Sequence, residues 1–397
     1  MIELVVALGL GAIISLTLYT LTSGTSQIFY EQQRIAASQL ALRSAVERLR
    51  AEIGRAGYLA TPNSDVDPDV CPPGSLDCPN PPLRGVQLLN QDPVAAAAIP
   101  EPGTNIVARP DELTIFGAFD DGDSYFTTSL GAGMLELDNT TQSFQQRFGA
   151  AVIAGNIAAV IADSFNANRV LRIQCPGQSA VFQAITGPAT WTGSTVQVPY
   201  GMLNAVGPYQ PAGIGWRCEV STATFARYHV RNVCALFPAT CRAGGEPDKT
   251  DLIRVDLTPA LVEIAGTERI VAEYAVDFDV SFDVDTAATP AVPGTVNPPV
   301  VQQCSFASSA AWAVGGAGSL AGRVRAVLFR LSVRTRNEDP SFPWVANPGL
   351  PLVRFKLRPV GTTTAACRVR TISTRVELPN FAAANIQSPT SAGAPCM

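Results

Sequence analysis

The N-terminus is the feature that most constrains the fold, because residues 4–21 contain no charged side chain. Together with Ile2, this run approaches the roughly 20 apolar residues that a helix needs to cross a bilayer. A cleaved signal peptide is the alternative, but it would start with a basic segment, and no lysine or arginine precedes Arg34. We therefore expect residues 1–24 to form a membrane segment, with Glu3 as a carboxylate at its edge.

A helical pattern continues beyond the apolar run, since no proline occurs between residues 25 and 58. Apolar residues repeat every seven positions, with two more between them: Ile28, Ile35, Leu42, Leu49, Ala56, Val46 and Ile53. The stripe widens only after Leu42, so we expect the first half to be membrane or exposed stalk and the second half to dock on a globular domain. Two ion pairs are expected on the polar side, Arg43–Glu47 and Arg48–Glu52.

The remainder, residues 59–397, has the pattern of a single large β-rich domain. Only 15% of all residues are charged, the mean hydropathy is +0.17, and Pro-rich loops are expected at 60–111 and 286–303. Short strands are expected at 112–119, 151–162, 169–175, 180–185, 217–230, 252–257, 269–284, 323–335, 352–358 and 368–378. The predicted fold class is therefore α+β, with a long transmembrane and amphipathic helix (1–58) packed on this domain.

Charge and histidine content exclude several classes of function. The net charge is −5 and the 28 basic residues are scattered along the chain, so nucleic acid is not an expected partner. The single histidine, His229, excludes a zinc site with several histidines and is expected to be structural. The sequence around Ser319 lacks a nucleophile elbow and that around Lys249 lacks a P-loop, so we expect no catalytic residues and no cofactor.

Acidic residues cluster in one expected strand. Its alternation places apolar residues on one face, namely Val276, Phe278, Val280, Phe282 and Val284. Carboxylates occupy the other face, namely Asp277, Asp279, Asp283 and Asp285. These could bind Ca²⁺, as could residues 120–124 or 65–69, but none completes an EF-hand loop. We interpret each cluster as solvated surface and expect no metal site.

The nine cysteines indicate an oxidising compartment, because eight of them lie in loop-like or strand-flanking sequence. Cys71–Cys78 and Cys234–Cys241 have short, equal spacings and are expected to form local disulfides. A zinc site is the alternative, but its usual C-x2-C spacing is absent. Sequence does not fix the remaining connectivity, for which we expect two longer bridges, with Cys396 left over. These bridges are Cys175–Cys218 and Cys304–Cys367.

The first eight residues, MIELVVAL, resemble the start of mature type IV pilins, in which a glutamate precedes a long apolar helix. Pilins carry this glutamate fifth in the mature chain, so we expect the sequence to begin two residues inside the mature protein. Within this class the chain is most similar to the minor pilin PilW family, which has a large β-rich domain. The likeness lies in RLRAEIGRAGYL (48–59), FARYHVRN (225–232), ERIVAEYAVDFDVSFD (268–283), VRAVLFRLSVRT (324–335) and RTISTRVELPN (370–380).

The resemblance implies that Glu3 pairs with the N-terminal amine of a neighbouring subunit during assembly. The alternative is a carboxylate that merely reaches the lipid head groups. The resemblance also implies that an apolar face packs in the membrane and then in the filament core. The residues of this face are Leu4, Val5, Leu8, Leu10, Ile13, Ile14, Leu16 and Leu18.

The resemblance further implies a minor pilin that helps to initiate or cap a type IV pilus, without enzymatic activity. Its partners would be other minor pilins, the major pilin and a tip adhesin. It would lie in the inner membrane with a periplasmic domain, and then at the tip of a surface pilus. A type II secretion pseudopilin is the first alternative, and a signal-anchored periplasmic binding protein or enzyme is the second.

Overall fold

The computed structural model describes most of the chain. The described residues are 2–64, 67, 70–71, 78–89, 99–100, 107–108, 110–119, 122–131, 133–203, 217–241, 249–285, 301–304, 322–345, 352–357 and 365–383. Within them, only the backbone is described at 2, 4–8, 27, 99–100, 107–108, 301–302, 304 and 382–383. Over these residues the chain is α+β, with a long N-terminal helix and a large β-rich domain, as the sequence predicts.

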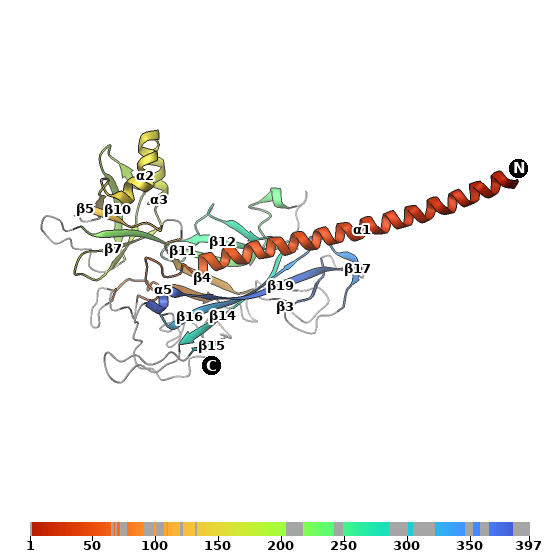
Figure 1. Ribbon diagram of the computed structural model, residues 1–397. Helices are drawn as coiled ribbons and strands as arrows, with labels where there is room; N and C mark the ends of the chain where they lie inside the picture. Colours follow the sequence, from red (N-terminus) through yellow and green to blue (C-terminus); the bar gives the residue numbers. More distant parts are fainter. Residues whose placement is uncertain are drawn as a thin grey trace.

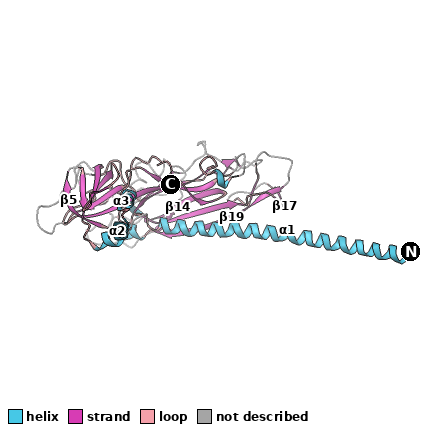
Figure 2. Ribbon diagram, turned by 90° about the horizontal axis from the view of Figure 1, so that it is seen from above, coloured by secondary structure: helices cyan, strands magenta, loops and turns pink. Residues whose placement is uncertain are grey.

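Helix α1 (Ile2–Ile53) dominates the shape of the molecule. Its N-terminal half extends away from the β-rich domain, whereas its C-terminal half lies along that domain (Figures 1 and 2). Ile28 is 56% exposed, but from Leu42 onward one face of the helix is buried, at Leu42, Ala45, Val46, Leu49 and Ile53. The expected docking of the second half is therefore confirmed.

The helix ends at Ile53, five residues before the expected end at residue 58. Gly57 has φ of 72°, and its N–H donates to the Phe116 carbonyl (2.8 Å) instead of continuing the helical pattern. A Cβ at this position would lie 2.8 Å from the ring of Phe381 in the short helix α5 (Pro379–Ala383). The turn is thus set by the close approach of two distant segments.

A six-stranded antiparallel barrel forms the end of the domain farthest from the free end of α1 (Figure 1). Going round the barrel, the strands are β11 (Glu219–Arg231), β5 (Tyr125–Gly131), β6 (Met134–Leu137), β10 (Val196–Met202), β8 (Val181–Ile185) and β7 (Val170–Gln174). The barrel closes because Val220 of β11 pairs with Tyr125 on one side and Ile173 on the other. The short β9 (Thr190–Trp191) adds to β10. Closure leaves these strands without the open edge that promotes aggregation.

The C-terminal part of β11 leaves the barrel and enters an antiparallel sheet under α1. Its other strands are β1 (Val86–Leu89), β4 (Glu112–Gly117), β12 (Asp251–Leu257) and β13 (Arg269–Ala272). A separate short hairpin pairs β2 (Ile99–Pro100) with β3 (Val107–Ala108). A single long strand therefore belongs to both the barrel and the sheet that supports the helix.

A second antiparallel sheet completes the domain, in the order β15–β14–β16–β19–β17, with β18 also on β19. Its strands are β14 (Ala275–Asp285), β15 (Val301–Cys304), β16 (Val324–Arg334), β17 (Asp339–Pro343), β18 (Arg354–Phe355) and β19 (Ala365–Glu377). Leu49 of α1 joins one buried cluster with Tyr228 of β11 and Phe278 of β14. The helix is thus part of the main core rather than an appendage to it.

The expected strand at 151–162 is wrong, because α2 (Gln142–Ala154) and α3 (Ile157–Ser164) occupy this segment. Gly155 separates them in the left-handed conformation, with φ of 71°. Phe148 of α2 and Ile161 of α3 both belong to the buried cluster of the barrel. Two helices separated by a glycine explain their spacing better than one strand does. A short apolar run does not distinguish a buried strand from a buried helix.

Other strand predictions need smaller corrections. The run 269–284 divides into β13 and β14 at a turn in which Tyr274 has φ of 57°, and 352–358 shortens to β18. The Pro-rich stretch 60–111 contains β1, and residues 301–303 of the expected linker 286–303 belong to β15. Residues 286–300 lie outside the described part. The strands β5, β6, β10 and β17 were missed because their alternation is short and interrupted by Gly or Pro.

A register shift also changes one face of β14. The ladder with β16 skips between Ala275 and Asp277, so Val276 packs in a separate cluster with Phe355 and Cys367. The predicted alternation holds only from Phe278 onward, since Phe278, Val280, Phe282 and Val284 share the main core. A β-bulge reverses side-chain direction locally, and nothing in the alternating sequence announces it.

Candidate functional site

The free half of α1 presents a continuous run of exposed apolar side chains. Leu10, Ile13, Ile14, Leu16 and Leu18 are 57–65% exposed. Glu3 is exposed in the first turn of the helix. The side chains of Leu4, Val5 and Leu8 lie outside the described residues, although their backbone is helical. No other described element covers this face, and exposed apolar surface of such extent is typical of interaction sites.

The threonine side chains of the same segment form hydrogen bonds with the helix backbone. The hydroxyls of Thr17, Thr20, Thr22 and Thr25 each donate to a carbonyl three or four residues earlier, with shortest distances of 2.7–2.9 Å. The hydroxyl hydrogens of these threonines are therefore bonded within the helix. Among the described residues, no helix is both long enough and apolar enough to span a bilayer.

A buried polar network fixes the docked end of α1. Arg254 of β12 is 2% exposed and contacts Glu52 (Nε to Oε2, 3.2 Å) and Asp256 (Nη2 to Oδ1, 3.1 Å). Tyr228 donates its hydroxyl hydrogen to Glu52, and burial next to this carboxylate raises the pKa of Tyr228 well above its ordinary value. Arg48 pairs with the same Glu52 at 3.0 Å, as expected. The network sets the position of the helix along the sheet.

The second expected pair on α1 differs from the prediction. Glu47 pairs with Arg50 at 3.2 Å, and not with Arg43. Both arrangements are allowed on a helix surface, where residues three and four apart are neighbours. With side chains 49% and 70% exposed, this pair contributes little to the free energy of unfolding.

The acidic face of β14 is not simply solvated. Each of its carboxylates pairs with an arginine of β16 or β19, so the face is a ladder of alternating charges. The contacts are Arg330–Asp277 (2.9 Å), Arg330–Asp279 (3.2 Å), Arg375–Asp283 (2.5 Å) and Arg325–Asp285 (3.2 Å). The expectation that these aspartates form a solvated surface is therefore wrong. Strand order alone brings these arginines beside the aspartates, because the partners lie 40 to 92 residues apart in sequence.

Asp111 joins the two sheets at one end of this ladder. Its N–H donates to the Phe278 carbonyl (2.6 Å), and its carboxylate accepts the Val280 N–H (2.8 Å). Burial, reinforced by Asp279 and Asp277, raises the pKa of Asp111 from 3.8 to about 7. The junction between the sheets therefore contains a carboxyl group that titrates near neutral pH.

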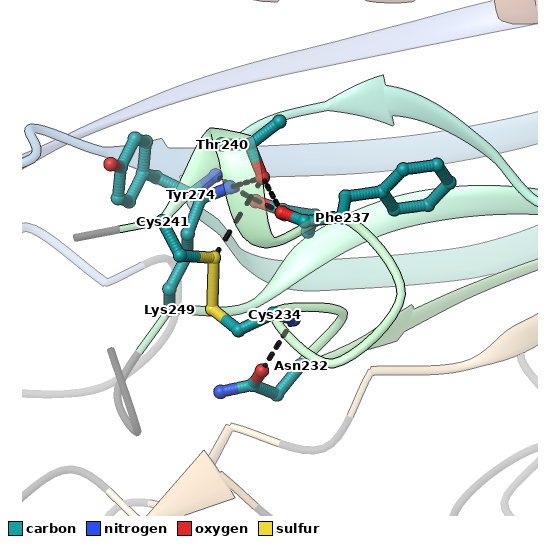
Figure 3. The surroundings of a disulfide bond; sticks show 8 residues. Asn232, Cys234, Phe237, Thr240, Cys241, Lys249 and Tyr274 are labelled. Atoms are coloured by element: carbon teal, nitrogen blue, oxygen red, sulfur yellow. Dashed lines mark hydrogen bonds and ion pairs between the residues drawn. A yellow bond between two sulfur atoms is a disulfide. The ribbon is translucent and has the colours of Figure 1, made fainter. Parts of the chain in front are cut away.

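Three of the four expected disulfides are formed. Cys71–Cys78 and Cys234–Cys241 close short loops, and Cys175–Cys218 joins the end of β7 to the start of its neighbour β11, next to the pair Gln174–Glu219. Figure 3 shows the Cys234–Cys241 loop, in which Thr240 accepts a hydrogen bond from Lys249 Nζ (3.0 Å). Lys249 is fully buried and also pairs with Asp251 at 2.8 Å. The disulfide and the buried lysine together fix this loop on the sheet.

The expected bridge between Cys304 and Cys367 is wrong, because Cys367 is a buried free cysteine. The side chain of Cys304 lies outside the described residues, but its backbone register explains the result. Cys304 pairs with Phe282, which aligns through Val327 with Val376. Cys367 lies nine residues away along the same strand, about 30 Å at roughly 3.3 Å per residue. Burial raises the pKa of the Cys367 thiol to about 11, so it is unreactive at neutral pH.

His229, expected to be structural, is buried on β11. It is 6% exposed, and within the described residues neither ring nitrogen makes a hydrogen bond. Burial, together with the positive charges of Arg231 and Arg227, lowers the pKa of His229 from 6.5 to about 4. Glu263, 3.6 Å away, acts in the opposite direction but does not offset them. The ring is therefore neutral at pH 7.

Two clefts in the described part of the chain are further candidate sites. One, of about 410 Å³, lies on the sheet of β14, β16 and β19 and is lined in part by Asp279, Arg330 and Arg375. The other, of about 310 Å³, lies between residues 163–169 and 264–269, with Thr224 and Asp256 also in its lining. Among the described residues, no group of three or more His, Cys, Asp or Glu side chains could hold a metal ion. Parts of the stretches 65–69 and 120–124 lie outside the described residues, so their calcium hypothesis stays untested.

Comparison with known proteins found no matching family model, no matching curated protein and no matching solved structure.

The functional features were unequally visible in the sequence. The free apolar helix and the two local disulfides could be read directly from residue patterns. The Arg254 network and the Asp111 junction were missed, because a lone arginine or aspartate in a strand pattern carries no signal of its partners. An arginine within an otherwise apolar strand, as in DLIRVDL (251–257), is the one hint of a buried ion pair.

Proposed function

We propose that this protein is a minor pilin of a type IV pilus, which assembles through α1 and helps to initiate or cap the filament. The observation that carries the proposal is the free half of α1, with large apolar side chains such as Ile13 and Leu16 more than half exposed. Such a surface requires either lipid or other apolar helices around it. A minor pilin meets both environments in turn, first in the inner membrane and then in the filament core.

Small residues in the same segment support helix packing. A Cβ at Gly9 or Gly11 would meet no atom within 4 Å, so the helix backbone is open to a neighbour at these positions. Ala12 and Ser15 extend this region of small side chains. Close approach of helices at such residues drives association where no hydrophobic effect distinguishes lipid from protein.

The role proposed for Glu3 follows from its charge in an apolar environment. A carboxylate in the filament core is costly unless a cation neutralises it, and the N-terminal amine of a neighbouring subunit is such a cation. Pairing of the two fixes the axial register of the incoming subunit. The globular domain then projects outward, where it contacts other minor pilins, the major pilin and a tip adhesin.

The experiment is a comparison of Glu3→Ala with Glu47→Ala on the same helix. Both remove one carboxylate, but Glu47 lies in the docked half, with a side chain 70% exposed and an adjacent partner in Arg50. We expect Glu3→Ala to block incorporation into pili without affecting membrane insertion, and Glu47→Ala to assemble normally. Normal incorporation of Glu3→Ala would refute the proposed role.

Deletion of the gene separates the pilin from its first alternative, a type II secretion pseudopilin. A minor pilin predicts loss of surface pili and twitching motility with intact protein secretion. Loss of secretion with intact pili would favour the pseudopilin. Measurement of both phenotypes in one strain therefore decides between two proteins with the same kind of helix.

A binding protein on a membrane anchor is the second candidate, and the cleft next to Thr224 favours it. The cleft has an appreciable volume of about 310 Å³ and polar walls that include Asp163, Arg169 and Glu268. Thermal unfolding with and without small periplasmic solutes, such as sugars and amino acids, tests this alternative. A rise in melting temperature that Thr224→Val abolishes would support this alternative. It would replace the pilin proposal only if the deletion strain also had intact pili.

A further inference from the structure

One region of the chain has a charge opposite to that of the rest. Residues 334–370 contain seven arginine and lysine residues and only two acidic ones, whereas the whole chain has a net charge of −5. The other residues together are therefore strongly acidic. This local excess is hidden in the overall composition, where basic residues appear scattered.

The fold brings the described parts of this segment, residues 334–345, 352–357 and 365–370, to the end of the domain where α1 emerges. Two of the counted cations, Arg334 and Lys356, are buried there. Figures 1 and 2 both show β17 as the labelled strand nearest the free end of the helix. β17 and β18 pair side by side with the first residues of β19. Ser341 of β17 donates to Glu31 of α1 (3.2 Å), so the two elements are in contact. We call this region the basal surface and define it by Arg336, Phe342, Val345, Val353, Arg354 and Arg368.

The basal surface combines cations with exposed apolar groups. Phe342 has the guanidinium carbons of Arg354 and Arg368 each 4.5 Å from its ring centroid. Val345 is 54% exposed, Val353 is 46% exposed, and Arg336 is exposed. Stacking on an aromatic ring holds both guanidinium groups in place although they carry the same charge. Three carboxylates lie beside these cations and offset part of the positive charge. Asp339 pairs with Arg368 at 2.7 Å, Glu31 accepts from Ser341, and Glu338 accepts the Leu357 N–H at 3.0 Å.

The adjacent helix surface carries exposed aromatic side chains. Phe29 and Tyr30 are each 64% exposed and directly precede Glu31, which contacts β17. If the apolar run ends at Leu21, Glu31 lies about 15 Å farther along the helix. A head-group layer about 5–8 Å thick then leaves the basal surface within about 10 Å of the lipid surface, which is close to one Debye length.

We propose that the basal surface binds anionic lipid head groups while the subunit waits in the inner membrane before assembly. Charge complementarity favours this occupant, since each arginine near an anionic leaflet gains electrostatic attraction that a neutral lipid does not provide. Binding orients the β-rich domain upright on its helix. The inference rests on the proposed function, because it places α1 in that membrane.

The experiment measures amide hydrogen exchange of the full chain in vesicles of phosphatidylcholine, with and without phosphatidylglycerol. Phosphatidylglycerol is expected to slow exchange in residues 336–345 and 353–357 about fivefold or more, and raised salt to abolish the effect. Arg336→Glu should remove the slowing. Arg147→Glu is the matched control, because Arg147 lies on α2 next to the barrel, and it should leave the slowing unchanged.

Each other outcome overturns a defined part of the argument. If the chain inserts into both kinds of vesicle and exchange is equal in both, the lipid inference is wrong and the membrane anchor stands. If the chain binds neither kind of vesicle, the membrane anchor and the lipid inference are both wrong. If the same segments are protected without lipid as protein concentration rises, the basal surface binds a second copy of the chain instead.

Discussion

Two arginines contact the same carboxylate of α1, and they provide a sharp test of how the helix is held. Arg254 is 2% exposed and lies 3.2 Å from Glu52, whereas the side chain of Arg48 is 39% exposed and lies 3.0 Å from it. Arg254→Met leaves the carboxylates of Glu52 and Asp256 without their shared buried cation. We expect this substitution to lower the free energy of unfolding by about 3–5 kcal/mol.

Arg48→Met is the matched control, since it removes an exposed partner of the same carboxylate. Its expected cost is about 0–1 kcal/mol, because exposed pairs are screened by water and salt. Urea unfolding of the full chain in non-ionic detergent, followed by far-ultraviolet circular dichroism, measures both values. The double variant Arg254→Met with Glu52→Gln should recover part of the loss, as it also removes the unpaired charge. Equal effects of the two single substitutions would show that burial does not govern this network.

Three further predictions concern pH and the barrel disulfide. Asp111 has a pKa of about 7 in the folded chain against 3.8 in the unfolded chain, so its contribution to stability is complete below pH 3.8 and is lost as the pH rises through 7. Asp111→Asn should therefore raise the free energy of unfolding at pH 8 by up to about 4 kcal/mol. The urea midpoint measured across pH checks this. His229 has a pKa of about 4 against 6.5, so stability falls as pH drops from 6.5 to 4, and His229→Leu should flatten that acid limb in the same titration. Replacement of both Cys175 and Cys218 by Ala opens a loop with a sequence separation of 43 and should cost about 4 kcal/mol, whereas no change in thermal midpoint would mean that closure of the barrel by hydrogen bonds alone suffices.

Elements with local causes were predictable from the sequence. The long helix follows from a proline-free run with a repeating apolar stripe, and the point at which the stripe widens, Leu42, is the point at which burial begins. The bridges Cys71–Cys78 and Cys234–Cys241 follow from short spacing with turn-forming residues inside. In each case the residues that determine the feature are close together in the chain.

Features with distant causes were not predictable. The aspartates of β14 looked like solvated surface because their arginine partners come from β16 and β19, and only strand order places them opposite each other. The bridge expected for Cys367 failed for the same reason, since strand register separates it from Cys304. The 151–162 segment was assigned to a strand because a short apolar run has no period of its own.

The sequence by itself determined that this protein has a long apolar and amphipathic N-terminal helix, a β-rich body and local disulfides, because these depend on periodicity and spacing. The tertiary structure decided where the helix ends, at Gly57 against Phe381, and which half of it is left without a partner. It also decided the closure of the barrel and the gathering of a basic surface beside α1. These depend on contacts between segments hundreds of residues apart, for which a single sequence carries no local signal.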